Sequence, residues 1–212
     1  MSDWQEDLIT TEAAGTLDGL FEERVRRTPE ATAYRDFDKS AQRWVDSSWR
    51  EVAAQVARWR VALAHEAFEH GERAAIQLPN SIEWVYFDQA ALACGLATVP
   101  LYPDDRPENI AYIMQLQGRS QEECDARVSE VARKLEIHTL LDKLPGQLSG
   151  GQQQRVAVAR AVAATPKLIL ADEPTANLDS KTAASLMDMM ERLNQDEGVT
   201  VIFSSHDPMV IG

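Results

Sequence analysis

The sequence predicts an α/β protein in which helices are layered against a mostly parallel sheet, and two observations lead to this fold class. Segments with apolar residues at helical spacing alternate with short runs of strand length along the 212-residue chain. Such an alternation is typical of a layered α/β unit. In the second half, the runs 167–171 and 199–204 are apolar enough to be predicted as buried strands.

The first half predicts three helices and three strands behind an acidic leader at residues 1–15. The helix that begins at Leu17 ends before Pro29, and Ser48 and Glu51 form a capping-box pattern ahead of the second helix. The predicted helices are 17–28, 49–68 and 81–94, and the predicted strands are 31–37, 73–78 and 97–101.

The second half predicts four helices around its two strands. These helices are 107–117, 120–136, 149–164 and 180–195, the last of them closed near Gly198. No linker rich in Gly, Ser or Pro separates the halves, because the turn-like stretch Pro103–Pro107 is short. The order of elements nevertheless changes at 107, where the alternation of strands and helices gives way to two successive helices. We therefore expect one fragment over 16–106 and another over 107–212.

Composition limits the classes of partner and compartment. A formal net charge of −13 argues against nucleic acid as a partner. Cys94 and Cys124 lie in no metal or redox spacing and are expected to be free thiols. Since the acidic N-terminus has no apolar stretch behind it, we expect no signal peptide, and the most apolar run, Ala90–Leu101, is shorter than the ~20 residues of a membrane helix. We expect a cytoplasmic protein without direct membrane insertion.

A first chemical motif lies in Leu148–Gln152. Ser149 is placed as a helix N-cap, and Gly150 and Gly151 leave backbone N–H groups bare at a helix start, where a phosphate binds well. The alternative is a plain capping box between Ser149 and Gln152.

A second group of motifs follows. Asp172 and Glu173 end an apolar strand, where Asp172 could hold Mg²⁺ through water and Glu173 could polarise an attacking water. The alternative is a strand that runs into a polar loop. Asp179 closes the acidic turn 176–179 and is equally well explained as a helix N-cap. His206, just after a strand, could reach a phosphate or be an ordinary surface residue.

Taken in order, these motifs resemble the ABC ATPase family over 107–212. Leu148–Gln152 is similar to the signature motif, 168–172 to the Walker B strand, 176–179 to the D-loop, and His206 to the switch histidine. The phrase 168–179 most resembles the lipoprotein-release and macrolide-export subfamily. The resemblance implies ATP and Mg²⁺ as cofactors, and a second ABC ATPase subunit and a membrane permease as partners. It implies catalytic roles for Glu173 and His206, a metal role for Asp172, and nucleotide contacts from Ser149, Gly150, Gly151, Gln152 and Asp179.

The sequence departs from that family at one essential point. No Gly-Lys pair, and hence no Walker A phosphate loop, occurs in it, and the upstream glutamine loop is missing, with Gln89 in no context to replace it. We therefore predict that the chain alone binds ATP very weakly and does not hydrolyse it.

The stretch 16–113 instead resembles the N-terminal segment of an adenylate-forming enzyme, in particular a long-chain acyl-CoA synthetase. The matching phrases are Thr28–Tyr34, Ile76–Asn80, Ala97–Pro103 and Asp105–Ile113, and none carries a catalytic group. Tryptophans 44, 49, 59 and 84 are interpreted as packing residues rather than a ligand cage.

Residues Pro107–Ile113 fit both families, so we hypothesise that two genes were joined within this stretch. Three functions remain open: an ABC-type ATPase component, a fatty-acid-CoA ligase fragment, and a non-catalytic chimeric or interaction protein. Whether the two fragments pair their sheets also stays open.

Overall fold

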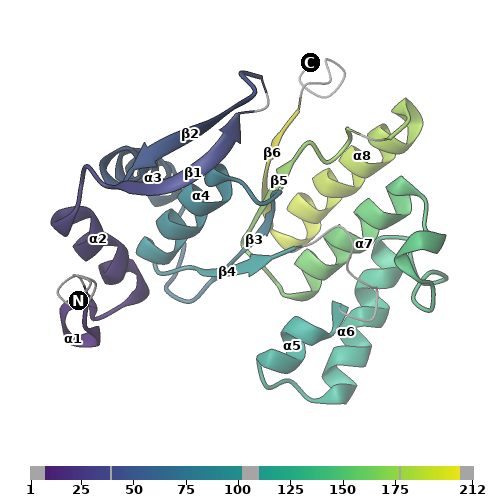
Figure 1. Cartoon of the computed structure of the whole chain (residues 1–212). Helices are drawn as coiled ribbons and strands as arrows, with labels where there is room; N and C mark the ends of the chain where they lie inside the picture. Colours follow the sequence, from purple (N-terminus) through teal and green to yellow (C-terminus); the bar gives the residue numbers. More distant parts are fainter. Residues whose placement is uncertain (1–7, 39, 102–109, 177, 206–212) are drawn as a thin grey trace. The chain divides into compact units, whose positions relative to one another are not determined.

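The computed structural model describes residues 8–38, 40–101, 110–176 and 178–205 (Figure 1). Two compact units emerge, one formed by Met1–Gly71 with Asn80–Ala97 and the other by Glu72–Pro79 with Thr98–Gly212. The short stretch 72–79 therefore belongs to the second unit although it lies within the first half of the sequence. His206 and Asn177 lie outside the described residues, as do positions 102–109 at the expected join.

The first unit contains helices around a two-stranded antiparallel hairpin. Its elements are α1 (Thr11–Ala14), α2 (Leu17–Arg27), β1 (Thr32–Asp38), β2 (Arg43–Ser48), α3 (Trp49–Ala64) and α4 (Ile82–Ala93). The predicted capping box at the start of α3 is confirmed, since Ser48 and Glu51 each accept from the other's backbone N–H. α3 ends at Ala64 rather than at residue 68, because the N–H of His65 already turns back to Ala62 and Leu63.

The core of the first unit lies between α3 and α4. Val52 and Val56 of α3 are buried, and Trp59 meets the fully buried Phe87 edge to face, with ring centroids 5.3 Å apart. Trp59 is thus a packing residue, as expected. Trp44, in contrast, is 64% exposed and contacts Phe37 across the hairpin.

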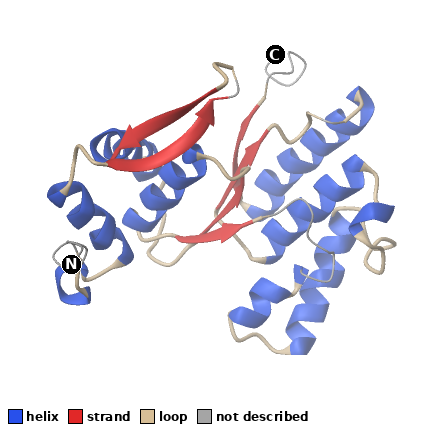
Figure 2. Cartoon of the chain, viewed as in Figure 1, coloured by secondary structure: helices blue, strands red, loops and turns tan. Residues whose placement is uncertain are grey.

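The second unit is built on a four-stranded sheet of order β4-β3-β5-β6 (Figure 2). Its elements are β3 (Arg73–Gln77), β4 (Ala97–Pro100), α5 (Tyr112–Leu116), α6 (Gln121–Lys134), the 3-10 turn η3 (Pro145–Gln147), α7 (Gly150–Ala163), β5 (Leu168–Asp172), α8 (Ser180–Glu197) and β6 (Thr200–Ser204). β5 runs parallel to both β3 and β6, which confirms the predicted α/β class with a parallel sheet.

Strand β3 brings the two halves of the sequence into one sheet. Ile76 pairs in register with Leu170, and the residues Ala74, Ala75 and Ile76 are fully buried. At the start of the pair, Lys167 donates its backbone N–H to the carbonyl of Arg73 at 2.8 Å. The Arg73 guanidinium donates to Thr165 Oγ1, also at 2.8 Å. The sequence left open whether strands of the two fragments pair with each other, and β3 of the first half does pair with β5 of the second.

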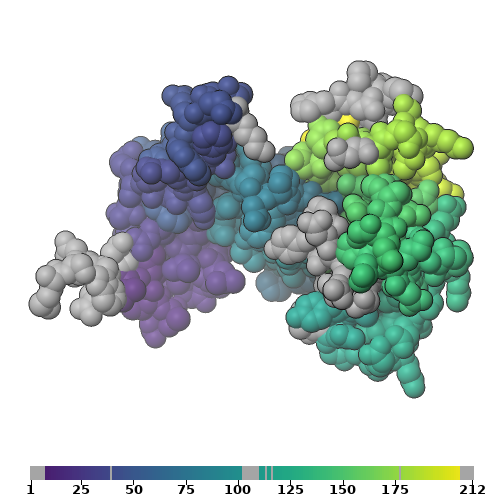
Figure 3. All heavy atoms as spheres, turned by 45° about the vertical axis from the view of Figure 1, so that its right-hand side comes forward, coloured from purple at the N-terminus to yellow at the C-terminus, as the bar shows by residue number. Residues whose placement is uncertain are grey.

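Helix α7 lies at the centre of the second unit's core. Every residue from Val156 to Ala163 is buried, which is possible because alanine and valine dominate this stretch and permit close approach on all sides. Side chains of α7 and α8 lie side by side in the space-filling view (Figure 3). Cys124 and Val131 of α6 belong to the same buried cluster. Cys124 and Cys94 are free, as expected.

Two predictions about the second unit were wrong in detail. β6 is not a buried strand: its residues are half-buried or exposed, and Ile202 is 37% exposed, because β6 is the last strand of the described sheet. The helix predicted from 107 begins only at Tyr112 in the described part, since Ile110 and Ala111 form a preceding turn. None of the helices within the described ranges is both long and apolar enough to cross a bilayer.

Candidate nucleotide site

The helix start at Ser149 is a complete capping box. Ser149 donates its N–H to Gln152 Oε1 at 3.0 Å, and Gln152 donates its N–H to Ser149 Oγ at 3.3 Å. The structure thus contains the plain capping box that was the alternative interpretation of this motif. Ser149 and Gly150 nevertheless remain exposed, so the capped helix end is accessible from solvent.

Gly151 allows α7 to approach the start of α8 closely. A Cβ atom at this position would lie 2.4 Å from Thr182 Cγ2, closer than any real contact. The same imaginary Cβ would lie 3.8 Å from Leu178 Cδ2. The segment 148–152 is therefore packed against the segment 178–182, which brings two of the sequence motifs together.

Asp179 caps α8, as one of its two sequence interpretations holds. Its carboxylate accepts from the backbone N–H groups of Lys181 and Thr182, each at 3.1 Å, and from Thr182 Oγ1 at 2.6 Å. The hydrogen bond from the Thr182 hydroxyl is the first cause that lowers the pKa of Asp179. The same threonine thus supplies a cap hydrogen bond with its hydroxyl and contacts Gly151 with its methyl group.

Arg155 links α7 to neighbouring elements by hydrogen bonds of its guanidinium group. Its guanidinium donates to the Leu135 carbonyl at 3.1 Å, to Glu136 Oε2 at 2.7 Å and to Ser185 Oγ at 2.7 Å. It therefore ties α7 to the end of α6 and to α8. Gln153 adds a hydrogen bond to the carbonyl of Pro145 at 3.0 Å. Both residues lie in the first half of α7, after the capping box.

The carboxyl ends of β5 and β6 form a second group. Ser204 Oγ donates to Asp172 Oδ1, and the Glu173 N–H lies 3.2 Å from both the carbonyl oxygen and the Oγ of Ser204. Glu173 has a φ of 47°, in the left-handed region that a non-glycine residue rarely adopts. Because parallel strands end at one edge of the sheet, the register that pairs Asp172 with Ser204 creates this group.

Sequence reasoning missed Ser204, although a signal existed. Once 168–172 and 199–204 are taken as adjacent parallel strands, the residues that end them must meet. It also missed Gln77, which ends β3 and donates through Nε2 to Gln154 Oε1 at 2.9 Å. That contact depends on the pairing of β3 with β5, which no local pattern reveals.

The described residues contain no cluster of three or more His, Cys, Asp or Glu suited to a metal ion. The donor set at β5 and β6 still fits Mg²⁺ bound through water, because Asp172 is an exposed carboxylate beside the Ser204 hydroxyl. Oxygen ligands with several retained waters are what Mg²⁺ prefers.

Comparison with known proteins finds one family and a second group of relatives. The family model described as AMP-binding enzyme matches residues 21–205, so the chain belongs to that family. The curated relatives are transport and import ATP-binding proteins, so the chain resembles both of the families that its sequence predicts. The finer assignment to the lipoprotein-release and macrolide-export subfamily stays a prediction.

Three of these relatives give the scale of the similarity. The sulfoquinovosyl glycerol transport protein SmoE of Agrobacterium fabrum is 39% identical over 141 residues, 65% of this chain and 37% of its own length. The glucose import protein GlcV of Saccharolobus solfataricus is 38% identical over 152 residues, 64% of this chain and 42% of its own length. The glycerol-3-phosphate import protein UgpC of Rhodopseudomonas palustris is 46% identical over 101 residues, 48% of this chain and 28% of its own length. The chain thus spans less than half of each relative.

Solved structures of ATP-binding cassettes are also similar. A dimeric cassette in a post-hydrolysis state with ADP and Pi is 40% identical, with a TM-score of 0.45 over 52% of this chain and 50% of that one. A dimeric bacterial ABC transporter cassette is 29% identical, with a TM-score of 0.47 over 68% of this chain and 78% of that one.

Proposed function

We propose that residues 107–212 supply the signature half of a composite ATP site, and that the chain does not hydrolyse ATP alone. The observation that carries this proposal is the exposed, capped start of α7, which packs against the start of α8 through Gly151 and Thr182. At the carboxyl edge of the sheet in the same unit, Ser204 holds Asp172 and the backbone of Glu173. The similarity to ABC ATP-binding proteins supports the choice of ATP.

The two groups have different proposed tasks. Asp172 would hold Mg²⁺ through water, and Glu173 would accept a proton from the attacking water. Ser149, Gly150, Gly151 and Gln152 present the start of α7 to the phosphates, and Asp179 holds the turn before α8. His206 contacts the terminal phosphate. Bound Mg²⁺ would neutralise phosphate charge when present.

The proposal requires a partner, because a signature segment without a phosphate-cradling loop lacks the backbone N–H groups and the lysine that hold the β- and γ-phosphates. The partner is a second ABC ATPase subunit with a complete loop. A membrane permease would bring the pair to the cytoplasmic face of a membrane.

The test compares ATP hydrolysis by the intact chain, by a complete ABC ATPase subunit, and by their mixture. We expect no turnover from the chain alone and altered turnover in the mixture. Glu173→Gln removes the effect of mixing, whereas Glu122→Gln, an exposed position on α6, leaves it intact. Hydrolysis by the chain alone that disappears in Glu173→Gln would contradict the proposed dependence on a partner.

A ligase is the second candidate, because the AMP-binding family model spans 21–205. Residues 16–106 supply none of the adenylation chemistry in this proposal and act as a structural fragment behind the leader 1–15. Release of pyrophosphate on addition of ATP and a long-chain fatty acid would favour the ligase instead, and we expect none.

A further inference from the structure

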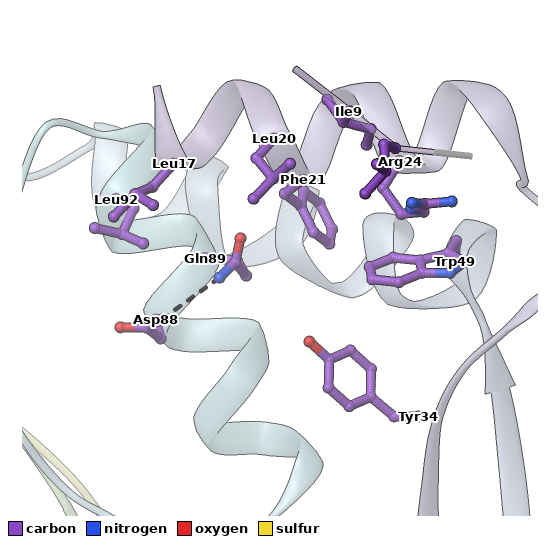
Figure 4. Close-up of a pocket in the computed structure, with 11 residues that line it drawn as sticks. Ile9, Leu17, Leu20, Phe21, Arg24, Tyr34, Trp49, Asp88, Gln89 and Leu92 are labelled. Carbon is purple, nitrogen blue, oxygen red and sulfur yellow. Dashed lines mark hydrogen bonds between the residues drawn. The ribbon is translucent and has the colours of Figure 1, made fainter. Parts of the chain in front are cut away.

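The first unit holds a pocket of about 550 Å³ beneath α2 (Figure 4). Leu17, Leu20 and Phe21 of α2 form one wall, and Gln89 and Leu92 of α4 form the opposite one. Tyr34 of β1 and Trp49 of α3 close the remaining side. Pockets of roughly 300–1,000 Å³ with apolar walls and a few polar groups are typical of small-molecule sites.

The apolar wall of this pocket is open to solvent to an unusual degree. Leu17 is 70% exposed, Leu20 is 42% exposed and Leu8, which also lines the pocket, is 58% exposed. No residue of α2 is buried, so the apolar side chains of this helix stay at least partly exposed to solvent. Three leucines that line the pocket are therefore accessible from solvent.

Aromatic rings form one end of the pocket. The Trp49 ring meets Phe21 edge to face, with centroids 6.0 Å apart, and lies 5.9 Å from Tyr34. The expectation that Trp49 only packs was thus incomplete, because its ring also lines the pocket. Ring faces grouped in this way attract cations within about 6 Å of a centroid.

The polar groups on the α4 side are acceptors. Gln89 directs its amide N–H toward Asp88 Oδ2 at 3.5 Å, which leaves its amide oxygen directed toward the pocket (Figure 4). Burial, and then the negative charge of Asp88, raise the pKa of Tyr34. Arg24 lies across the pocket from α4, with its guanidinium beside the Trp49 ring at the aromatic end (Figure 4).

We propose that this pocket binds a small amphipathic organic cation, with its apolar body against Leu17, Leu20 and Leu92 and its ammonium group between the aromatic rings and the Asp88 side. The net charge of −13 favours cations at the surface of the chain as a whole. This site is independent of the proposed ATP chemistry, because all of its lining residues belong to the first unit.

The test uses three probes of nearly the same shape: 2-phenylethylamine, 2-phenylethanol and phenylacetate. Binding to the intact chain is measured by ligand-observed NMR and by the change in tryptophan fluorescence. We expect the amine to bind about tenfold more tightly than the alcohol, a ratio within the range of a cation over aromatic rings, and phenylacetate to bind most weakly.

Two variants separate charge from shape. Asp88→Asn reduces the affinity of the amine to that of the alcohol, whereas Asp142→Asn, which changes the net charge equally at an exposed position of the second unit, has no effect. Leu17→Asn, at a side chain too exposed to be needed for folding, weakens the amine and the alcohol alike.

The relative affinities of the three probes decide whether the pocket binds cations. Phenylacetate as the tightest probe would assign the pocket to anions through Arg24 and overturn the proposal. Equal affinities for the three probes, or no binding of any at 10 mM (about the weakest useful affinity for so few atoms), would overturn it as well. An unchanged amine affinity in Asp88→Asn would remove the carboxylate from the site.

Discussion

Gln77 Nε2 donates to Gln154 Oε1 at 2.9 Å, and this bond joins the last residue of β3 to the helix that follows the capping box. Gln77 is only 7% exposed, so its amide is largely withdrawn from water. The two residues come from segments that resemble different families, yet their side chains satisfy each other. The second unit is therefore held together across the expected join by a polar contact as well as by sheet pairing.

Removal of this contact is expected to destabilise the chain. Gln77→Ala leaves the Gln154 amide without its partner in a partly buried position, which costs about 1–2 kcal/mol of unfolding free energy. Urea unfolding measures the loss, and Gln117→Ala, at an exposed position after α5, provides the control. Equal stability of the two variants would mean that water replaces Gln77 without cost.

Separation of the two segments tests the shared sheet. A chain of residues 107–212 lacks β3 and β4, and so leaves unpaired the edge of β5 that Ala74, Ala75 and Ile76 pair with. We expect this fragment to bind hydrophobic dyes and to melt without a cooperative transition, whereas the intact chain melts cooperatively. A cooperative transition of the isolated fragment would show that β3 is dispensable.

Gly151 offers a test of the packing between α7 and α8. Gly151→Ala places a methyl group 2.4 Å from Thr182 Cγ2 and is expected to cost about 1–3 kcal/mol, the usual range for overpacking. Thr182→Ser removes the obstructing methyl group but keeps the hydroxyl that donates to Asp179. The double variant should therefore recover most of the stability that Gly151→Ala loses, as measured by thermal unfolding. A double variant as unstable as the sum of both changes would place the strain elsewhere.

The ionisation of Glu197 is expected to make the stability of the second unit depend on pH. Hydrogen bonding from Lys134, with Arg127 nearby, holds the pKa of Glu197 below its ordinary value. A lowered folded-state pKa means that the ionised form stabilises the fold at neutral pH, and that this contribution is lost as the pH falls from the ordinary value of ~4.3 through the folded one. Glu197→Gln should flatten this acid limb in denaturant unfolding followed from pH 7 to pH 3. Glu122→Gln should leave it unchanged.

The sequence predicted the local parts of this structure well and the long-range parts poorly. Helices α3 and α7 were located by the capping boxes at Ser48 and Ser149, which are interactions between residues three apart, and α3 also by its apolar spacing. β2 was missed because the hairpin exposes most of its residues, so no apolar pattern marks it. The assignment of β3 to the sheet of the second half depends on a partner about ninety residues away, as the Arg73–Thr165 bond illustrates (|i−j| = 92).

The candidate site shows the same division. Ser149 and Asp179 cap helices, as one interpretation of each motif held, because a cap is decided within one turn. Ser204 acts on Asp172 only through the register of β5 and β6. A residue whose role comes from strand pairing is invisible to spacing until that pairing is known.

Strand β6 has an outer edge that no strand of the described sheet pairs with. Thr200 donates its N–H to Lys167 and Ser204 accepts from Glu173, so alternate residues 200, 202 and 204 direct their backbone groups to β5 and its ends. Val201 and Phe203 then direct theirs outward, where no strand of the described sheet receives them. The run Val199–Ser205 carries no charge and no proline, the features that usually protect such an edge.

We expect this edge to pair with itself in a second copy of the chain at high concentration. Charge repulsion between chains of net charge −13 is smallest along a run without charged side chains. Ile202→Lys, at a side chain that is 37% exposed, should shift the apparent mass measured by light scattering toward the monomer. Val61→Lys, at another exposed apolar position, on α3, should leave the mass unchanged. A wild-type chain that stays monomeric at millimolar concentration, or an equal effect of both lysines, would contradict pairing through β6.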